Sequence, residues 1–257
     1  MIVLHGGSMS AEQARRNVGV ERLVGQEGIV AVYPEGIGHQ WNDGRRWQMG
    51  RFQKQPSSAD DVAFIRAIIK RLIEQRVADS RRIYVIGTSN GGMMTLRLLC
   101  EAADIIAGVA AIAANMPVDL VTACKPVRPV ATLLMNGTAD TWVPYEGGGI
   151  APGGKGQVLS TDDTIRLLRS FNGCSPDAKT ELIPKRDPAG TSRAIRVSWT
   201  NCSSKVPVVL YRIEGGGHRI PHPADPSRPI VDVLLGVQNR DFDGVDAIWT
   251  FLQEIPR

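Results

Sequence analysis

The chain has 257 residues, of which 43% are hydrophobic and 22% are charged. That size and composition are typical of one soluble globular domain, so we treat residues 1–257 as a single unit. No apolar run approaches the roughly 18 residues of a membrane-spanning helix, which argues against a membrane partner. The net charge of +4 comes from scattered basic residues, which argues against a nucleic-acid partner.

Apolar runs with little alternation predict strands that are covered on both faces of a sheet. In chain order they lie at residues 2–4, 29–33, 83–86, 108–113, 130–135 and 206–213. Helical patterns lie between them, at residues 11–26, 60–77, 90–103, 161–171 and 245–254. This alternation predicts an α/β fold with a mostly parallel, doubly wound sheet.

Several local features complete this pattern. Asp60 and Asp61 open the second helix, where acidic residues are typical of an N-cap and of favourable charge near the helix dipole. The glycine-rich residues 146–156 predict a flexible loop, and residues 180–199 predict a β-hairpin.

Met1 leads directly into the first strand without a signal-peptide pattern, and we expect that the natural N-terminus has been lost or mis-assigned.

A G-x-S-x-G pentapeptide lies between a predicted strand and a predicted helix. It consists of Gly87-Thr88-Ser89-Asn90-Gly91. In this context the pentapeptide predicts a nucleophile elbow, a strained turn in which the flanking glycines leave room for close neighbours. Ser89 is then the nucleophile, and an ordinary turn between strand and helix is the alternative.

A serine hydroxyl needs a histidine base and usually a carboxylate that orients this base. The order serine, acid, histidine of the α/β-hydrolases leaves only His218 and His222. We favour His218 because it follows the last strand directly on a glycine loop, and His222 then has a surface or supporting role. Asp140 follows the strand-like run 130–135 and is predicted to orient the imidazole, with an Asx turn as its alternative.

Acyl transfer also needs backbone N–H groups that face the developing oxyanion. We expect one from Asn90 and one from Gly7, which lies in a His-Gly-Gly loop after the first strand. A plain Gly-Gly turn is the alternative for that loop. His5 and Trp142 are assigned to substrate binding, although Trp142 could instead belong to the core. This chemistry requires no metal ion and no organic cofactor.

The four cysteines allow three disulfide pairings or four free thiols. Pairing of neighbours in sequence would join Cys100 to Cys124 and Cys174 to Cys202. Disulfides would indicate an oxidising compartment, and none of the four cysteines shows the spacing of a metal site.

Further motifs follow one another along nearly the whole chain. They are Leu4-His5-Gly6-Gly7, Tyr33-Pro34-Glu35-Gly36, Trp41-Asn42, residues 60–65, residues 87–94, residues 136–140 with Val143-Pro144-Tyr145, Asn172-Gly173-Cys174, residues 199–202 and Gly215-Gly216-Gly217-His218. Together they resemble the secreted esterase family that contains short-chain-type polyhydroxybutyrate depolymerases and bacterial feruloyl or acetylxylan esterases.

The resemblance implies an α/β-hydrolase fold, here without the family's usual first strands. It also implies triad roles for Ser89, Asp140 and His218, and two disulfides between neighbouring cysteines in a secreted or periplasmic protein. The chain departs from the family after His218, where Arg219-Ile220-Pro221-His222 replaces an aromatic continuation. Trp142 could supply an alternative wall of the substrate cleft.

We therefore expect a serine carboxylesterase that acts on hydroxycinnamoyl or other small carboxylic esters. A hydroxybutyrate oligomer or polymer and acetylated xylan are alternative substrates. An acyltransferase, or a non-catalytic binding protein on the same fold, would be a different class of protein.

Overall fold

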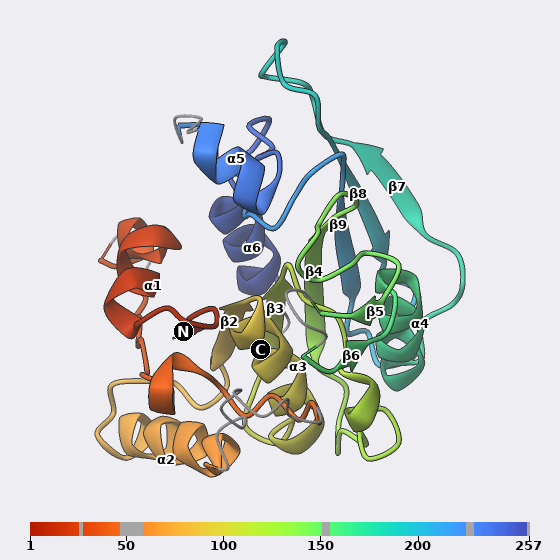
Figure 1. The fold of residues 1–257 in the computed structure, drawn as a ribbon. Coiled ribbons are helices and arrows are strands. Elements are labelled where there is room, and N and C mark those ends of the chain that lie inside the picture. Colours follow the sequence, from red (N-terminus) through yellow and green to blue (C-terminus); the bar gives the residue numbers. More distant parts are fainter. Residues whose placement is uncertain (26–27, 47–58, 151–154, 225–228, 256–257) are drawn as a thin grey trace.

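The computed structural model describes residues 1–257 except 26–27, 47–58, 151–154, 225–228 and 256–257. Within the described residues, the central sheet has seven strands in the spatial order β1-β2-β3-β4-β9-β8-β7 (Figure 1). The strands are Ile2–Leu4 (β1), Tyr84–Thr88 (β2), Gly108–Ile112 (β3), Ala131–Gly137 (β4), Val208–Glu214 (β9), Arg193–Trp199 (β8) and Lys179–Leu182 (β7). The first five in this order are parallel, and β8 and β7 continue the sheet antiparallel.

Helices cover both faces of this sheet. They are Ala11–Asn17 (α1), Asp61–Glu74 (α2), Asn90–Glu101 (α3), Thr161–Asn172 (α4), Pro229–Leu235 (α5) and Gly244–Gln253 (α6). Short 3₁₀ turns lie at Val20–Leu23, Ile37–His39 and Val118–Leu120. The predicted doubly wound α/β fold is thus confirmed.

The core consists of two hydrophobic clusters, one on each face of the sheet. Helices α2, α3 and α4 contribute to the first cluster, and α6 with the turn Val20–Leu23 contributes to the second. Along β2, Val85 belongs to the first cluster, whereas Tyr84 and Ile86 belong to the second. This division follows from the alternation of side chains along a strand, and it explains why the central strands are apolar throughout.

The helix ends follow from local hydrogen bonding. Ser10 and Gln13 form a capping box at α1, and the side chain of Asp60 caps α2 by accepting from the N–H of Ala63. Asp61 is the first residue of α2, where acidic charge was predicted near the helix dipole. Its carboxylate is buried and accepts from the N–H of Asn42, and burial raises its pKa.

The predicted strand at residues 29–33 is wrong. Ile29 and Val32 form only isolated bridges, and the bridge of Val32 is to Ile2 of β1. Pro34 follows and has no N–H to extend the ladder. The predicted helix at 11–26 is also shorter than expected, because Gly19 takes a left-handed conformation with a φ of 85° and separates α1 from a 3₁₀ turn.

Other segments were less clear in the sequence. The hairpin is present as β7 and β8, and Figure 1 shows their connection projecting from the body of the protein. In the predicted flexible loop at 146–156, Gly148–Gly149 (β5) pairs with Gln157–Val158 (β6), which directly follows the loop, while residues 151–154 lie outside the described residues. Helix α5 was not predicted.

Two disulfides join Cys100 to Cys124 and Cys174 to Cys202. The first links the end of α3 to the turns that follow Val118–Leu120, and the second links the residues after α4 to the connection before β9.

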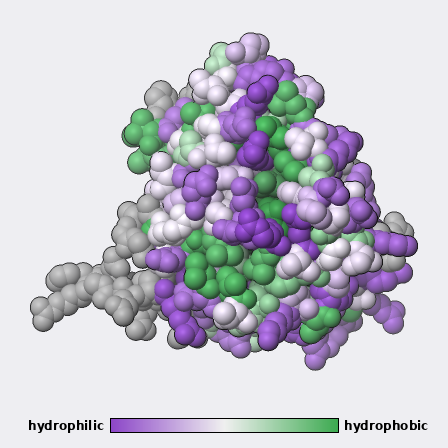
Figure 2. All heavy atoms as spheres, turned by 90° about the vertical axis from the view of Figure 1, so that its right-hand side faces the viewer, coloured by the Kyte–Doolittle hydropathy of each residue, from purple (hydrophilic) through white to green (hydrophobic). Residues whose placement is uncertain are grey.

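Among the described residues, no helix combines the length and hydrophobicity needed to cross a membrane. Figure 2 shows hydrophobic and polar patches side by side on the face that carries α4 and the outer strands.

Candidate active site

Ser89 occupies a strained turn between β2 and α3. Its backbone has a φ of 57° and a ψ of −120°, a conformation that is rare for a residue with a side chain. The flanking glycines are required by close contacts. A Cβ on Gly87 would lie 2.2 Å from the carbonyl oxygen of Gly91, and a Cβ on Gly91 would lie 2.4 Å from that of His5. The pentapeptide therefore adopts the geometry of the predicted elbow.

Three predicted residues lie just beyond the carboxyl ends of parallel strands. Ser89 follows β2, Asp140 follows β4 by three residues, and His218 follows β9 by four. These strands are in register across the sheet, since Thr88 pairs with Ile112, Ile112 with Met135 and Met135 with Tyr211. The three side chains therefore belong to one edge of the sheet, where ligands of open α/β sheets bind.

Asp140 and His218 are in direct contact. The Nδ1 atom of His218 lies 2.7 Å from Oδ2 of Asp140, and both side chains are largely buried. The other carboxylate oxygen, Oδ1, accepts from the N–H groups of Trp142 and Val143 at 2.8 and 2.9 Å. With its oxygens held on two sides, Asp140 fixes the direction from which it meets the imidazole.

His222 lies in a different environment from His218. Its Nε2 atom is 3.6 Å from a carboxylate oxygen of Asp243, which caps the start of α6. Within the described residues, Ser89 Oγ makes no hydrogen bond, including none to His218. A nucleophile in a protein without bound substrate commonly shows such loose geometry.

The loop after β1 lies against the elbow. A Cβ on Gly6 would lie 3.7 Å from Cβ of Ser89, and a Cβ on Gly7 would lie 3.5 Å from Cβ of Asn90. Within the described residues, the N–H of Gly7 has no hydrogen-bond partner. Asn90 begins α3, so its N–H belongs to the first turn, where helical N–H groups have no partner within the helix. The two predicted oxyanion donors are therefore neighbours.

His5 is buried beneath this loop. Its Nε2 atom accepts from the N–H of Gly36 at 3.0 Å, which leaves Nδ1 as the donor to the carbonyl of Gly6 at 2.8 Å. Burial lowers the pKa of the imidazole. Since the residue is only 1% exposed, the ring is closed off from the surface where a substrate would arrive.

Trp142 lies beside the catalytic imidazole predicted from the sequence. Its ring stacks against His218 with centroids 6.1 Å apart and an angle of 26° between the planes. The indole N–H donates to the carbonyl of Leu234 in α5, and the N–H of His218 donates to the carbonyl of Leu235. The unpredicted helix α5 therefore supports both rings.

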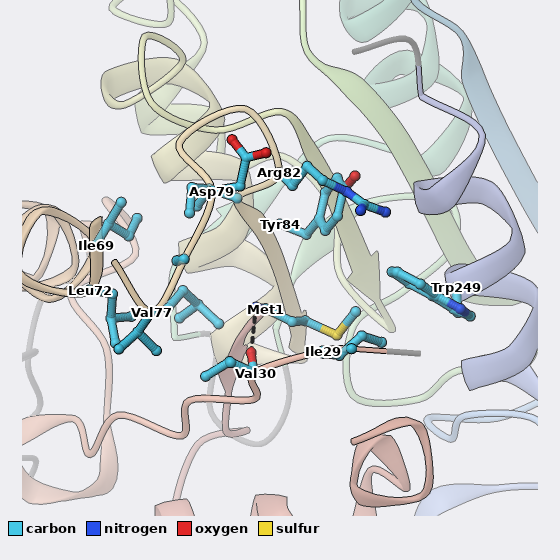
Figure 3. Close-up of a pocket in the computed structure, with 14 residues that line it drawn as sticks. Met1, Ile29, Val30, Ile69, Leu72, Val77, Asp79, Arg82, Tyr84 and Trp249 are labelled. Carbon is cyan, nitrogen blue, oxygen red and sulfur yellow. Dashed lines mark hydrogen bonds between the residues drawn. The ribbon is translucent and has the colours of Figure 1, made fainter. Parts of the chain in front are cut away.

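A pocket of about 170 Å³ lies away from these residues, at the amino ends of β1 and β2 (Figure 3). Met1, Tyr84 and Trp249 are among its lining residues, and the Met1 amine donates to the carbonyl of Val30. Burial lowers the pKa of this amine to about 6. Because the elbow is at the carboxyl ends of the strands, the pocket is separate from the candidate site.

The polar residues beneath the elbow were not predicted from the sequence. Asp43 and Arg45 form a buried ion pair, and Asp43 also accepts from the side chain of Asn90. Their segment has no helical or strand periodicity, and its only recognisable motif in the sequence is Trp41-Asn42. In the described part of the chain, no cluster of three or more histidine, cysteine or acidic residues could hold a metal ion.

The architecture of the sheet and the elbow at its carboxyl edge define an α/β-hydrolase. Residues 19–122 match the model of the prolyl oligopeptidase family. Among solved structures, the acetyl xylan esterase from Aspergillus awamori superimposes with a TM-score of 0.56 at 14% identity, covering 84% of this chain and 82% of that one. A phospholipase/carboxylesterase from Dyadobacter fermentans gives 0.52 at 14% identity, covering 85% and 82%. At these identities the likeness concerns the fold.

Sequence relatives are more specific. The putative esterase NocK of Nocardia uniformis subsp. tsuyamanensis is 31% identical over 98% of this chain and 73% of its own length. Feruloyl esterase B of Piromyces equi is 31% identical over 75% of this chain, which spans only 34% of that protein. The chain belongs to the esterase family of these relatives and is a carboxylesterase-type α/β-hydrolase.

Proposed function

We propose that the chain hydrolyses carboxylic esters by acyl transfer through Ser89, His218 and Asp140. Ser89 Oγ attacks the ester carbonyl while His218 takes its proton and passes it to the departing alcohol. Water, deprotonated by His218, then attacks the acyl-enzyme and releases the carboxylic acid. Asp140 holds the imidazole in one tautomer and stabilises its charged form.

One observation carries this proposal. The carboxylate of Asp140 accepts from His218 at 2.7 Å, at the same sheet edge as the strained turn of Ser89. Local strain of this kind is maintained only where the surrounding structure holds it, and it concentrates at functional sites. A purely structural turn would need neither a serine there nor an oriented imidazole beyond the neighbouring strand ends.

The N–H groups of Gly7 and Asn90 are proposed to stabilise the oxyanion of each tetrahedral intermediate. Each such donor is worth on the order of 3 kcal/mol of transition-state stabilisation. Because His5 is buried and bonded on both ring nitrogens, we assign it to the support of the Gly7 loop, in place of the substrate contact expected from the sequence.

For the substrate, we propose a hydroxycinnamoyl or another small carboxylic ester. Relatives named feruloyl esterase support this class, and the flat ring of Trp142 beside His218 is suited to contact an aromatic acyl group. The two disulfides fit an oxidising compartment, and we propose a secreted or periplasmic location.

The decisive experiment replaces the nucleophile. Ser89→Ala should lower the hydrolysis of p-nitrophenyl acetate by a factor on the order of 10⁴ or more, because no other group can form the acyl-enzyme. Circular dichroism and the unfolding midpoint should match those of the unchanged protein. Turnover retained by the variant would exclude this site.

A substrate panel tests the acyl group. Methyl ferulate, acetylated xylan, short p-nitrophenyl esters and hydroxybutyrate oligomers should be compared by kcat/KM. We expect methyl ferulate or the short esters to be preferred, and a preference for xylan or for the oligomers would assign the alternative substrates. Products formed with an added alcohol, at the expense of the free acid, would indicate an acyltransferase.

A further inference from the structure

Trp41 touches both halves of the proposed oxyanion hole. Its backbone N–H donates to Oδ1 of Asn90 at 2.7 Å, and Nδ2 of Asn90 donates back to its carbonyl at 3.0 Å. Its indole N–H donates to the carbonyl of His5 at 3.0 Å, and its ring lies over the His5 imidazole with centroids 4.8 Å apart. One buried residue thus joins the residue after the nucleophile to the loop that carries Gly7.

A buried ion pair holds the Asn90 side chain in this arrangement. Nδ2 of Asn90 also donates to Oδ2 of Asp43 at 2.6 Å. The guanidinium of Arg45 donates to both carboxylate oxygens of Asp43, and the side chains of Arg45 and Asp43 are 4% and 2% exposed. Burying such a pair carries a large desolvation penalty and is weak as a source of stability. Its value here is the fixed position it gives to Asn90.

The segment is also anchored to the neighbouring helices. The N–H of Asn42 donates to the Asp61 carboxylate in α2 at 2.7 Å, and the carbonyl of Asn42 accepts from Arg97 in α3 at 2.7 Å. The backbone between Trp41 and Asp43 is therefore bonded on both sides. It can act as a rigid support, since displacement of one end would break hydrogen bonds at the other.

We propose that residues 41–45 form a bracket that fixes the two oxyanion donors relative to each other, with Trp41 and Asp43 as positioning residues. This inference rests on the proposed acyl transfer. The negative charge on the substrate oxygen develops between two N–H groups that come from different parts of the chain, and stabilisation is strong only if both already point to it. The bracket supplies that preorganisation through the Asn90 side chain and the His5 carbonyl.

The chain offers a matched control for a test at Asn90. Asn172 is also buried, its Oδ1 accepts from the N–H of Val130, and its Nδ2 donates to the carbonyls of Val130 and Val206. The side-chain amide of Asn172 thus hydrogen-bonds to both the N–H and the carbonyl of one residue, Val130. The amide of Asn90 binds Trp41 in the same way. Val130 precedes β4, at the end of the sheet opposite to the elbow, so the two alanine variants lose similar bonds at different distances from the site.

The experiment compares Asn90→Ala, Asn172→Ala, Trp41→Phe and Ser89→Ala with the unchanged protein. Thermal unfolding and steady-state hydrolysis of p-nitrophenyl acetate are measured for each. The first two should lower the unfolding midpoint by similar amounts. Asn90→Ala should lower kcat roughly 10- to 100-fold with KM changed less than about threefold, because only the transition state needs the aligned donors. Asn172→Ala should keep kcat within about twofold.

Trp41→Phe is the milder variant and keeps the ring on His5 while removing the indole N–H. It should lower kcat with little change in KM. If Asn90→Ala does not fold, the kcat of Trp41→Phe tests the bracket by itself. Equal kcat in Asn90→Ala and Asn172→Ala, or a wild-type kcat in Trp41→Phe, would overturn the bracket. If Ser89→Ala remained active, the proposed acyl transfer itself would fail, so the two failures are distinguishable.

Discussion

At the scale of single residues, the site depends on backbone conformations that few side chains tolerate. Ser89 has a positive φ, and its neighbours Gly87 and Gly91 lie where a Cβ would overlap backbone atoms of the turn and of β1. The strain costs roughly 1–3 kcal/mol and must be offset by the surrounding packing. The buried β1 and α3 supply that packing, so the elbow is held by the core below it.

His5 should make the stability of the folded protein depend on pH. Burial lowers its pKa from the ordinary value of 6.5, so the unfolded chain binds a proton that the folded protein does not. Stability therefore falls as the pH decreases through 6.5 toward the lower folded value. We expect the free energy of unfolding, measured with urea between pH 7.5 and 5.5, to decrease less in His5→Gln than in the unchanged protein. Identical pH slopes would contradict this role of His5.

At the scale of elements, the two disulfides join segments that are separated in the sequence by 24 and 28 residues. The bond between Cys174 and Cys202 closes a loop with a sequence separation of 28 residues and ties the end of α4 to the connection before β9. A cross-link of that span restricts the unfolded chain and in the chain-entropy model contributes about 3.6 kcal/mol.

The double variant Cys174→Ser/Cys202→Ser should therefore unfold at a lower urea concentration, with a loss of about 3 to 4 kcal/mol in the free energy of unfolding. Its kcat should stay unchanged, because the bond lies at the amino end of β9 and His218 follows the carboxyl end. The oxidised and reduced forms of the unchanged protein serve as controls. An unchanged urea midpoint would show that the bond adds nothing to stability.

At the scale of the whole molecule, one sheet with a hydrophobic cluster on each face makes the structure interdependent. Residues of the same strand, such as Val85 and Ile86 of β2, belong to different clusters. Neither face can lose its packing without exposing strands that the other face needs, so the described residues should behave as one cooperative unit.

We expect differential scanning calorimetry to show one transition for residues 1–257, with a calorimetric enthalpy close to the van't Hoff enthalpy. The unfolding curves followed by circular dichroism and by tryptophan fluorescence should then coincide. Two resolved transitions would contradict the single-domain assignment.

Most of the fold could be predicted because its elements carry local signals. The apolar runs of β2, β3 and β4 are bounded by turn residues, and α2 has a clear helical period. The run at 29–33 has similar composition but forms only isolated bridges, since strand formation depends on a partner of sufficient length. Helix α5 has only seven residues, too few for a helical period to stand out in the sequence.

The sequence by itself predicted the nucleophile turn, from a short pentapeptide between a strand pattern and a helix pattern, and the α/β class, from the alternation of such patterns. The strand order that brings Ser89, Asp140 and His218 to one edge came from the structure, and the disulfide pairing was implied only by the resemblance to the esterase family. Only the tertiary structure decided that His5 is enclosed and that Asp43 holds Asn90. Such contacts join segments far apart in the chain, and their distances depend on packing that no local pattern encodes.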